Sequence, residues 1–138
     1  ASGSGNIAAM KQLKNYTGAP LPLPLQAAAA LAWRDEAHVE ENRAIYRRKY
    51  QMADEIFGNV AGYQPLEAGF FLWLPVENDE AAALKLWREA GVRCLPGSYL
   101  SRAVAGQAIG QDRLRVALVA EEQELQRGLL RLHGCLYQ

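Results

Sequence analysis

The residue of this sequence with the clearest chemical potential is an arginine inside an apolar run. Arg115 is flanked by Leu114 and Val116 in the stretch 113–119, a pattern that favours a β-strand. Burying a guanidinium without an anionic partner is costly, so this position is expected to bind an anion. The residues alone leave two partners open, a bound ligand or an acidic side chain of the same chain. The internal candidates are Asp112 and Glu67.

No convincing nucleophile, general base or metal site accompanies this arginine. The two cysteines, Cys94 and Cys135, are too few for a disulfide scaffold and are expected to be reduced thiols. The stretch 133–135 reads His-Gly-Cys, but it lacks the paired ligand spacing of a zinc site. The sequence therefore predicts no catalytic residue and no metal ligand in this chain.

Composition and charge narrow the class of protein. The chain has 138 residues, of which 50% are hydrophobic, enough for the core of one compact domain. Its 15 basic and 15 acidic side chains balance, whereas nucleic-acid binding requires a basic excess or stripe. The densest basic cluster, residues 47–49, is expected to be a solvated helix face. No apolar run approaches the roughly 20 residues of a membrane span, and no signal peptide opens the chain, so we expect a cytoplasmic protein.

Helix signals dominate the N-terminal part of the chain. Asn6 suits the cap of a first helix, Pro24 the first turn of a second, and Asp35 the cap of a long amphipathic third. Gly58 is a stop signal for that third helix. Residues 1–5 are expected to be a cut or frayed end, and 18–24, with three prolines, an extended connection. The expected helices are 7–14, 24–33 and 36–57.

Strand signals begin after residue 60 and are interleaved with helix signals. The expected strands are 62–66, 70–76, 92–95 and 113–119. The expected helices are 79–90, capped by Asn78 or Asp79, and 121–132 or beyond. This order predicts an α+β domain in which helices cover one face of a small sheet.

Several short segments, taken in order, carry a family resemblance. They are Gly-Phe-Phe-Leu-Trp-Leu at 69–74, Leu-Pro-Gly-Ser-Tyr at 95–99 and Arg-Val-Ala-Leu-Val at 115–119, with the upstream stretches 16–26 and 33–39. Together they resemble the C-terminal part of class I/II pyridoxal-phosphate-dependent aminotransferases, over about residues 7–132. The longer match at 96–102 is most similar to bacterial succinyldiaminopimelate aminotransferases, which act in lysine biosynthesis.

The resemblance implies a fold, a cofactor and a role for particular residues. Residues 35–138 would be the small domain, with a mostly antiparallel sheet, of a fold type I transaminase. Residues 6–34 would link it to a large domain. Arg115 would hold the substrate α-carboxylate, because a guanidinium fork matches a carboxylate bidentately. Gly69 and Phe70 would line the same substrate site, and the full-length enzyme would be a homodimer that uses pyridoxal phosphate.

Two of these positions carry alternatives. Gly69 is either a bulge or a point of close strand packing, or it lets the backbone approach the substrate. Phe70 and Phe71 are expected to alternate across the sheet, so that one faces the site and the other lies in the core. Ser98 and Tyr99 are further candidates for the lining of the site.

The sequence departs from the family pattern in one important respect. The family forms its Schiff base through a lysine in a Ser-x-Ser-Lys type context, and no lysine here has that context. The lysines are Lys11, Lys14, Lys49 and Lys85. The isolated chain is therefore expected to bind no cofactor and to be inactive. The alternative is a non-catalytic binding or assembly module that keeps the small-domain fold.

Overall fold

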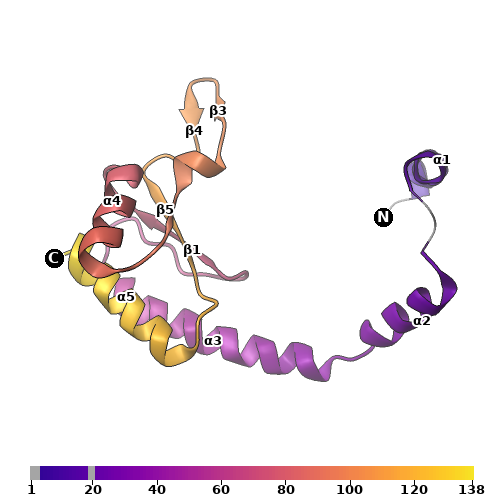
Figure 1. Ribbon diagram of the computed structural model, residues 1–138, viewed down its shortest axis with the longest axis horizontal. Helices are drawn as coiled ribbons and strands as arrows, with labels where there is room; N and C mark the ends of the chain where they lie inside the picture. The colour runs from indigo at the N-terminus through magenta and orange to yellow at the C-terminus, as the bar shows by residue number, and fades with distance from the viewer. Residues whose placement is uncertain (1–3, 19–20) are drawn as a thin grey trace. The chain divides into compact units, whose positions relative to one another are not determined.

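The computed structural model describes residues 4–18 and 21–138, and the chain divides into two units, Ala1–Glu41 and Asn42–Gln138 (Figure 1). The expected frayed end 1–5 lies largely outside the described residues, as does part of the expected extended connection 18–24.

The first unit is built from helices. A 3₁₀ turn, η1 (Ser4–Asn6), leads into α1 (Ile7–Thr17), and α2 (Leu23–Ala32) follows with a proline in its first turn. The predicted helices are confirmed, although α1 runs three residues further than expected. Asn6 occupies the cap position of α1 but makes no side-chain cap bond there.

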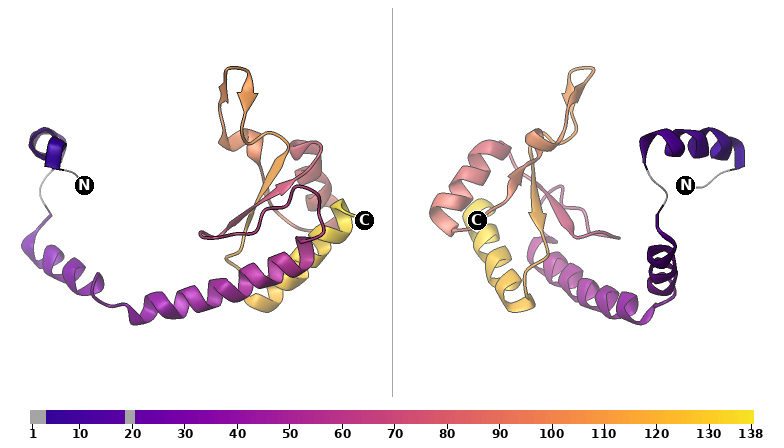
Figure 2. Two further views of the ribbon diagram at one scale, coloured as in Figure 1. Left: turned by 180° about the vertical axis from the view of Figure 1, so that it is seen from behind. Right: turned by 45° about the vertical axis from the view of Figure 1, so that its right-hand side comes forward.

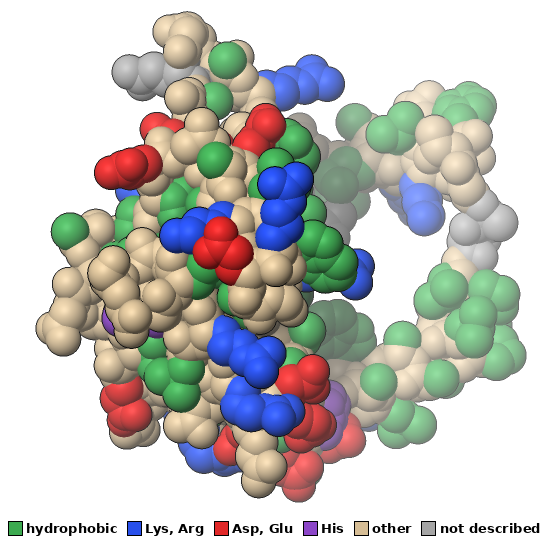
Figure 3. Space-filling view, turned by 60° about the vertical axis from the view of Figure 1, so that its left-hand side comes forward, with side chains coloured by type: hydrophobic (Ala, Val, Ile, Leu, Met, Phe, Trp, Pro, Cys, Tyr) green, Lys and Arg blue, Asp and Glu red, His purple; other side chains and the backbone are tan. Residues whose placement is uncertain are grey.

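The two helices α1 and α2 bury none of their described side chains. Figure 3 shows hydrophobic side chains gathered along this part of the chain. The most exposed are Leu13, Tyr16, Leu23, Leu31 and Trp33. A helix that is apolar yet uncovered, as α2 is, has the character of an interaction surface.

The long helix α3 (Ala37–Phe57) begins in the first unit and provides packing residues to the second. The Ala37 N–H donates to Oδ1 of Asp35 at 3.1 Å, as expected of a cap. Ala53 and Phe57 are fully buried on one stripe, with Tyr46 and Tyr50 packed beside them. The helix ends where predicted, before Gly58.

The second unit holds a three-stranded antiparallel sheet in the order β1-β5-β2. Its strands are β1 (Phe71–Pro75), β5 (Arg113–Ala117) and β2 (Leu95–Pro96). Leu72, Leu74, Leu114 and Val116 share one face and are buried. Helices α3 and α5 (Glu122–Leu136) lie on that side of the sheet (Figures 1 and 2), and the predicted α+β arrangement is confirmed.

A further helix completes the cover of the core. Asn78 caps α4 (Asp79–Lys85) by accepting the Ala81 N–H at 2.9 Å. The helix continues as a π-helical turn, η2 (Leu86–Ala90), and ends at Gly91 in the left-handed region. The predicted helix over 79–90 is thus present. Leu86 joins the hydrophobic core from this element.

Two strand predictions are wrong. Residues 62–66 form no strand, because Gly62 has a φ of +81° in a turn and Pro65 lacks an N–H for a sheet ladder. In place of the predicted strand 92–95 the structure has a two-residue strand, Leu95–Pro96. Its first residue, Val92, instead donates its N–H to the Leu86 carbonyl and closes the end of the preceding helix.

A small hairpin was not predicted at all. It consists of β3 (Ala103–Val104) and β4 (Gln107–Ala108), follows the 3₁₀ turn η3 (Gly97–Leu100), and projects from the sheet and helices (Figures 1 and 2). Its turn residues Ala105 and Gly106 both have positive φ. Alanine rarely adopts that conformation, so the sequence gives little signal for this turn.

The basic cluster 47–49 is not wholly a solvated helix face, which corrects the sequence-based expectation. Lys49 is only 5% exposed. Its ammonium donates to the carbonyls of Leu118 at 2.9 Å and Ala120 at 2.8 Å. Arg48 contacts Glu122 with an N–O distance of 2.6 Å. These bonds tie α3 to the end of β5 and the start of α5.

Replacement of Lys49 tests this connection. In Lys49→Met the two carbonyl groups lose their donor, and an unsatisfied buried acceptor costs about 1–3 kcal/mol. We expect the free energy of unfolding, measured by urea titration, to fall by at least about 2 kcal/mol. Lys85→Met is the matched control, since Lys85 is exposed and bonds one carbonyl, that of Cys135. Equal losses in the two variants would contradict the role assigned to Lys49.

The loop before the hairpin crosses the start of β5 at very close range. A Cβ on Gly97 would lie 2.1 Å from the Gly110 carbonyl oxygen and 2.6 Å from the Trp73 ring. The carbonyl belongs to the backbone and cannot rotate away. Ser101 reinforces the crossing, since its hydroxyl oxygen accepts the Gly110 N–H at 3.0 Å. Only glycine fits at this crossing.

Gly97→Ala should therefore destabilise the chain strongly. Overpacking typically costs about 1–3 kcal/mol, and contact with rigid backbone favours the upper end of that range. Gly128→Ala in α5 is the control, because nothing lies within 4 Å of its added Cβ. Replacing a mid-helix glycine should raise stability by roughly 0.5–1 kcal/mol. Urea unfolding of both variants checks the opposite signs, and a tolerated Gly97→Ala would refute the close crossing.

Candidate functional site

The face of the sheet turned away from the helices is the candidate site. Side chains alternate along a strand, so burial of Leu72, Leu74, Leu114 and Val116 leaves their neighbours on the other face. The antiparallel register sets Arg115 opposite Trp73 on one side and Leu95 on the other. The residues of this open face are Phe71, Trp73, Leu95, Arg113 and Arg115.

Arg115 is half-buried on this face and lies against an aromatic ring. Its guanidinium carbon is 4.3 Å from the centroid of the Phe71 ring. In the described part of the chain it forms no ion pair with Asp112 or Glu67. The alternative of an internal salt bridge is therefore wrong, since the described residues supply no acidic partner to this arginine.

Arg113, two residues earlier on the same face, differs from Arg115. It donates to the Gly62 carbonyl at 3.4 Å. One of its donors is thus used within the fold, at the loop around Gly62. The two arginines of β5 are thus chemically distinct although they share one strand and one face.

Phe70 and Phe71 do not divide between the site and the core. Phe71 is half-buried and Phe70 is 43% exposed, and neither belongs to the buried core. The expectation that one of them lies in the core is wrong because β1 begins at Phe71, so Phe70 precedes the regular alternation. Their ring centroids are 4.4 Å apart, and the Phe70 ring lies 6.4 Å from that of Tyr46 on α3.

Gly69 opens the segment that carries these rings. It has a φ of +87°, and nothing lies within 4 Å of a Cβ built on it. Close strand packing is therefore excluded as the reason for this glycine, and the backbone conformation is the reason instead. The Tyr50 hydroxyl donates to the Gly69 carbonyl at 2.5 Å, which fixes the segment to α3.

A buried carboxylate holds the loop beside the open face. Asp79, at the start of α4, is 5% exposed and accepts the Ser98 N–H at 2.7 Å. Burial by itself raises the pKa of Asp79, but hydrogen bonds from Ser98 and from backbone groups outweigh it and lower the pKa below its usual range. Tyr99, the next residue, is 67% exposed, so it stands free at the edge of this loop.

The lysines offer no nucleophile on this face. Lys49 is buried against two carbonyls, Lys85 donates to the Cys135 carbonyl, and Lys11 and Lys14 lie on α1 in the first unit. Burial raises the pKa of the Cys94 thiol to about 11, so it is protonated at neutral pH and is a poor nucleophile. Among the described residues no group of three metal-ligating side chains occurs, and no helix is long and apolar enough to cross a membrane.

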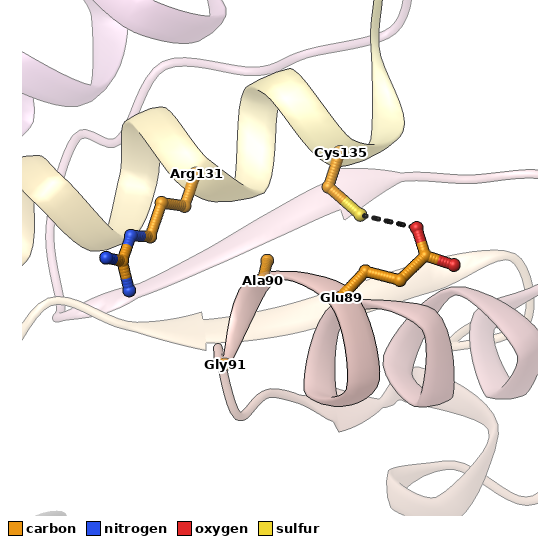
Figure 4. A pocket seen from close by; sticks show the side chains of 5 residues that line it. All are labelled: Glu89, Ala90, Gly91, Arg131 and Cys135. Carbon is orange, nitrogen blue, oxygen red and sulfur yellow. Dashed lines mark hydrogen bonds between the residues drawn. The ribbon is translucent and has the colours of Figure 1, made fainter.

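A separate hollow of about 620 Å³ lies between η2 and α5 (Figure 4). Glu89, Ala90, Gly91, Arg131 and Cys135 line it. Sγ of Cys135 lies 4.0 Å from Oε2 of Glu89, which is a weak contact. None of the predicted site residues Arg115, Gly69 and Phe70 borders this hollow, so it does not coincide with the candidate site.

The structure thus brings Arg115 into contact with Phe71 and places Phe70 and Gly69 next along the chain. Phe71 is the residue of this face that sequence reasoning assigned wrongly. A side chain at position 71 shares a face with position 115 whenever residues 73 and 115 are paired. That pairing cannot be deduced from one sequence.

Comparison with known proteins finds one family and several relatives that match most of this chain. The family described as "Aminotransferase class I and II" matches residues 5–132. A curated relative, the 4-dedimethylamino-4-oxo-anhydrotetracycline transaminase OxyQ of Streptomyces rimosus, is 27% identical over 91% of this chain and 34% of its own length. The putative aminotransferase AatC of Rhizobium meliloti is 31% identical over 88% of this chain and 30% of its length.

A solved structure shows the same fold over the same extent. The aminotransferase of Neisseria meningitidis Z2491 superposes with a TM-score of 0.84 at 30% identity and covers 93% of this chain. Only 33% of that structure is covered in return. The chain therefore spans about a third of the length of the relatives that it matches.

The lowered pKa of Asp79 makes stability dependent on pH. A carboxyl whose folded pKa is depressed stabilises the fold above its unfolded pKa, about 3.9, and loses this contribution as the pH falls through the folded value. Asp79→Asn should be less stable than the natural chain by about 1–3 kcal/mol at pH 7, with a gap that narrows below about pH 4. Urea titrations at pH 7, 4 and 3 measure it. Glu80→Gln, an exposed neighbour with the same change in charge, should show no such narrowing.

Proposed function

The chain belongs to the class I and II aminotransferase family, and we propose that it is the part of a transaminase that holds the α-carboxylate of the amino-acid substrate. Arg115 is the residue that does so in this proposal. The observation that carries it is the position of Arg115 on the open face, against a ring and without an acidic partner among the described residues.

The chemistry of a guanidinium explains why this arrangement suits a carboxylate. Its planar fork presents N–H donors that match the two oxygens of a carboxylate, and two parallel charge-assisted hydrogen bonds fix the orientation of the ligand as well as its position. A transaminase needs that orientation, because the bond broken at the substrate Cα must be held in one direction. Gly69 and Phe70 form the neighbouring wall in this proposal.

Family membership implies pyridoxal phosphate in the complete enzyme. The cofactor supplies an electron sink for the substrate Cα when it is bound. The residues of this chain do not fit it: Lys49 and Lys85 are held by backbone carbonyls, and no other lysine lies in the second unit. We therefore assign cofactor binding to a part of the enzyme outside this chain, and derive no cofactor step from these residues.

The wider assembly follows from the same proposal. The apolar and exposed helices α1 and α2 would link to a large domain and contact a second subunit of a homodimer. The donor would be an amino acid and the acceptor 2-oxoglutarate. N-succinyl-diaminopimelate, in lysine biosynthesis, is the proposed specific substrate on the strength of the match at 96–102. Location in the cytoplasm remains a prediction.

A non-catalytic binding or assembly module is the alternative function. It is favoured by one observation, that the described residues provide no lysine suited to the cofactor. In this alternative Arg115 binds a carboxylate without any reaction. The two functions differ in whether the full-length protein transfers an amino group.

Replacement of Arg115 in the full-length protein tests the proposal. Arg115→Ala removes a buried charged hydrogen-bond pair, worth roughly 2–5 kcal/mol, so kcat/KM should fall by about 30-fold to several thousand-fold. Arg115→Lys should also lose activity, because an ammonium keeps the charge but not the fork. The thermal midpoint should change little.

A matched control is Arg93→Ala, which removes an exposed arginine that lies over the Trp87 ring instead. Its kcat/KM should stay near the natural value. Near-natural activity of Arg115→Ala, or a loss that only follows unfolding, would assign Arg115 a structural role. A full-length protein that binds carboxylates but transfers no amino group would favour the alternative.

A further inference from the structure

We propose that Phe71 is a positioning residue, which holds the Arg115 guanidinium in the orientation that receives a carboxylate. This inference rests on the proposed function of Arg115 and deepens it. The two side chains lie on one face of the sheet, with the guanidinium carbon 4.3 Å from the Phe71 ring centroid. That distance is within the range of a cation–π interaction.

The register explains why Phe71 rather than Trp73 provides the ring. Trp73 is directly opposite Arg115, whereas Phe71 is opposite Ala117 and so diagonal to the arginine. Diagonal neighbours are about 7–8 Å apart at the backbone, within reach of a long side chain. The small residue Ala117 is the one opposite Phe71, and the Trp73 ring lies close to Gly97, 2.6 Å from the position of an added Cβ there.

Stacking orients a guanidinium without using its hydrogen-bond donors. The N–H groups lie in the plane of the group and point outward from its edge, so a ring that contacts the flat face uses none of them. An ion pair with an acidic neighbour would orient the group too, but would occupy the fork. No hydrogen bond or ion pair occupies the donors of Arg115 among the described residues. The ring therefore leaves both donors of the fork available to a ligand.

The Phe71 ring is itself fixed by its neighbours. The Phe70 ring centroid is 4.4 Å away, and Phe70 in turn lies 6.4 Å from the ring of Tyr46. The segment is anchored to α3 by the bond from the Tyr50 hydroxyl to the Gly69 carbonyl. A chain of ring contacts thus connects the long helix to the arginine.

The test compares Phe71→Leu, which removes the ring face, with Phe71→Tyr, which keeps it. In the full-length protein, Phe71→Leu should raise KM for the amino-acid substrate about 3- to 30-fold, the range of a cation–π contact, with kcat within about twofold. Phe71→Tyr should stay within about twofold in both constants. The Kd of glutarate, a non-reacting dicarboxylate, measured by calorimetry, should rise by the same factor as KM.

Two controls separate this role from a general effect on folding. Trp87→Leu removes the ring of a different cation–π pair of the second unit, that with Arg93, and should change neither constant. Phe71→Met keeps an apolar side chain without a ring face and should behave as Phe71→Leu does. All measurements are made below the lowest thermal midpoint of the set, so that loss of folded protein does not enter.

A double-mutant cycle distinguishes failure of the function proposed for Arg115 from failure of the positioning role proposed for Phe71. In an Arg115→Lys background, Phe71→Leu should weaken glutarate binding less than twofold further, because the planar group that it supports is gone. If Arg115→Lys leaves the glutarate Kd unchanged, the proposed function itself fails. If Arg115→Lys weakens binding and Phe71→Leu does not, only the positioning role of Phe71 is overturned. Equal losses for Leu and Tyr at position 71 would overturn it as well.

Discussion

Strand β5 can bury only one of its faces, and the rest of the second unit is arranged around that constraint. It is the central strand, paired with β1 on one edge and β2 on the other. Leu114 and Val116 must face the helices, so Arg113 and Arg115 must face away from them. A register shift of one residue would bury a guanidinium and expose two core side chains. The position of the candidate site is thus a by-product of core formation.

Two buried charged groups keep the elements around β5 in place. Lys49 binds the carbonyl groups that follow the strand, and Asp79 binds the loop that precedes it. Each satisfies backbone groups that no regular element would satisfy, which is why each is tolerated inside an otherwise apolar core. Because one lies beyond each end of β5, the strand is fixed along its length as well as across the sheet.

Much of the fold was readable from the sequence, because caps and alternation are local. Asp35, Asn78, Gly58 and Gly91 marked helix ends correctly, and the run 113–119 identified the central strand. The failures have two kinds of cause, partners far away in the chain and backbone conformations that the residue types do not signal. Lys49 binds carbonyls about 70 residues later, and the β3–β4 hairpin turns on an alanine with positive φ. The contact of Arg115 with Phe71 depends on a diagonal pairing that only the sheet register determines.

The conformation of Gly69 has a consequence for how a site of this kind diversifies. Space alone would accept a larger side chain there, since nothing lies within 4 Å of an added Cβ, but a φ of +87° disfavours every residue except glycine. A substitution of Gly69 that improved contact with a ligand would therefore also strain the backbone at that position. Selection for new ligands would act more freely at Tyr99, which is exposed on a loop whose backbone Asp79 already holds. Variation in ligand preference should therefore accumulate on the loop side of the face while the glycine side stays invariant.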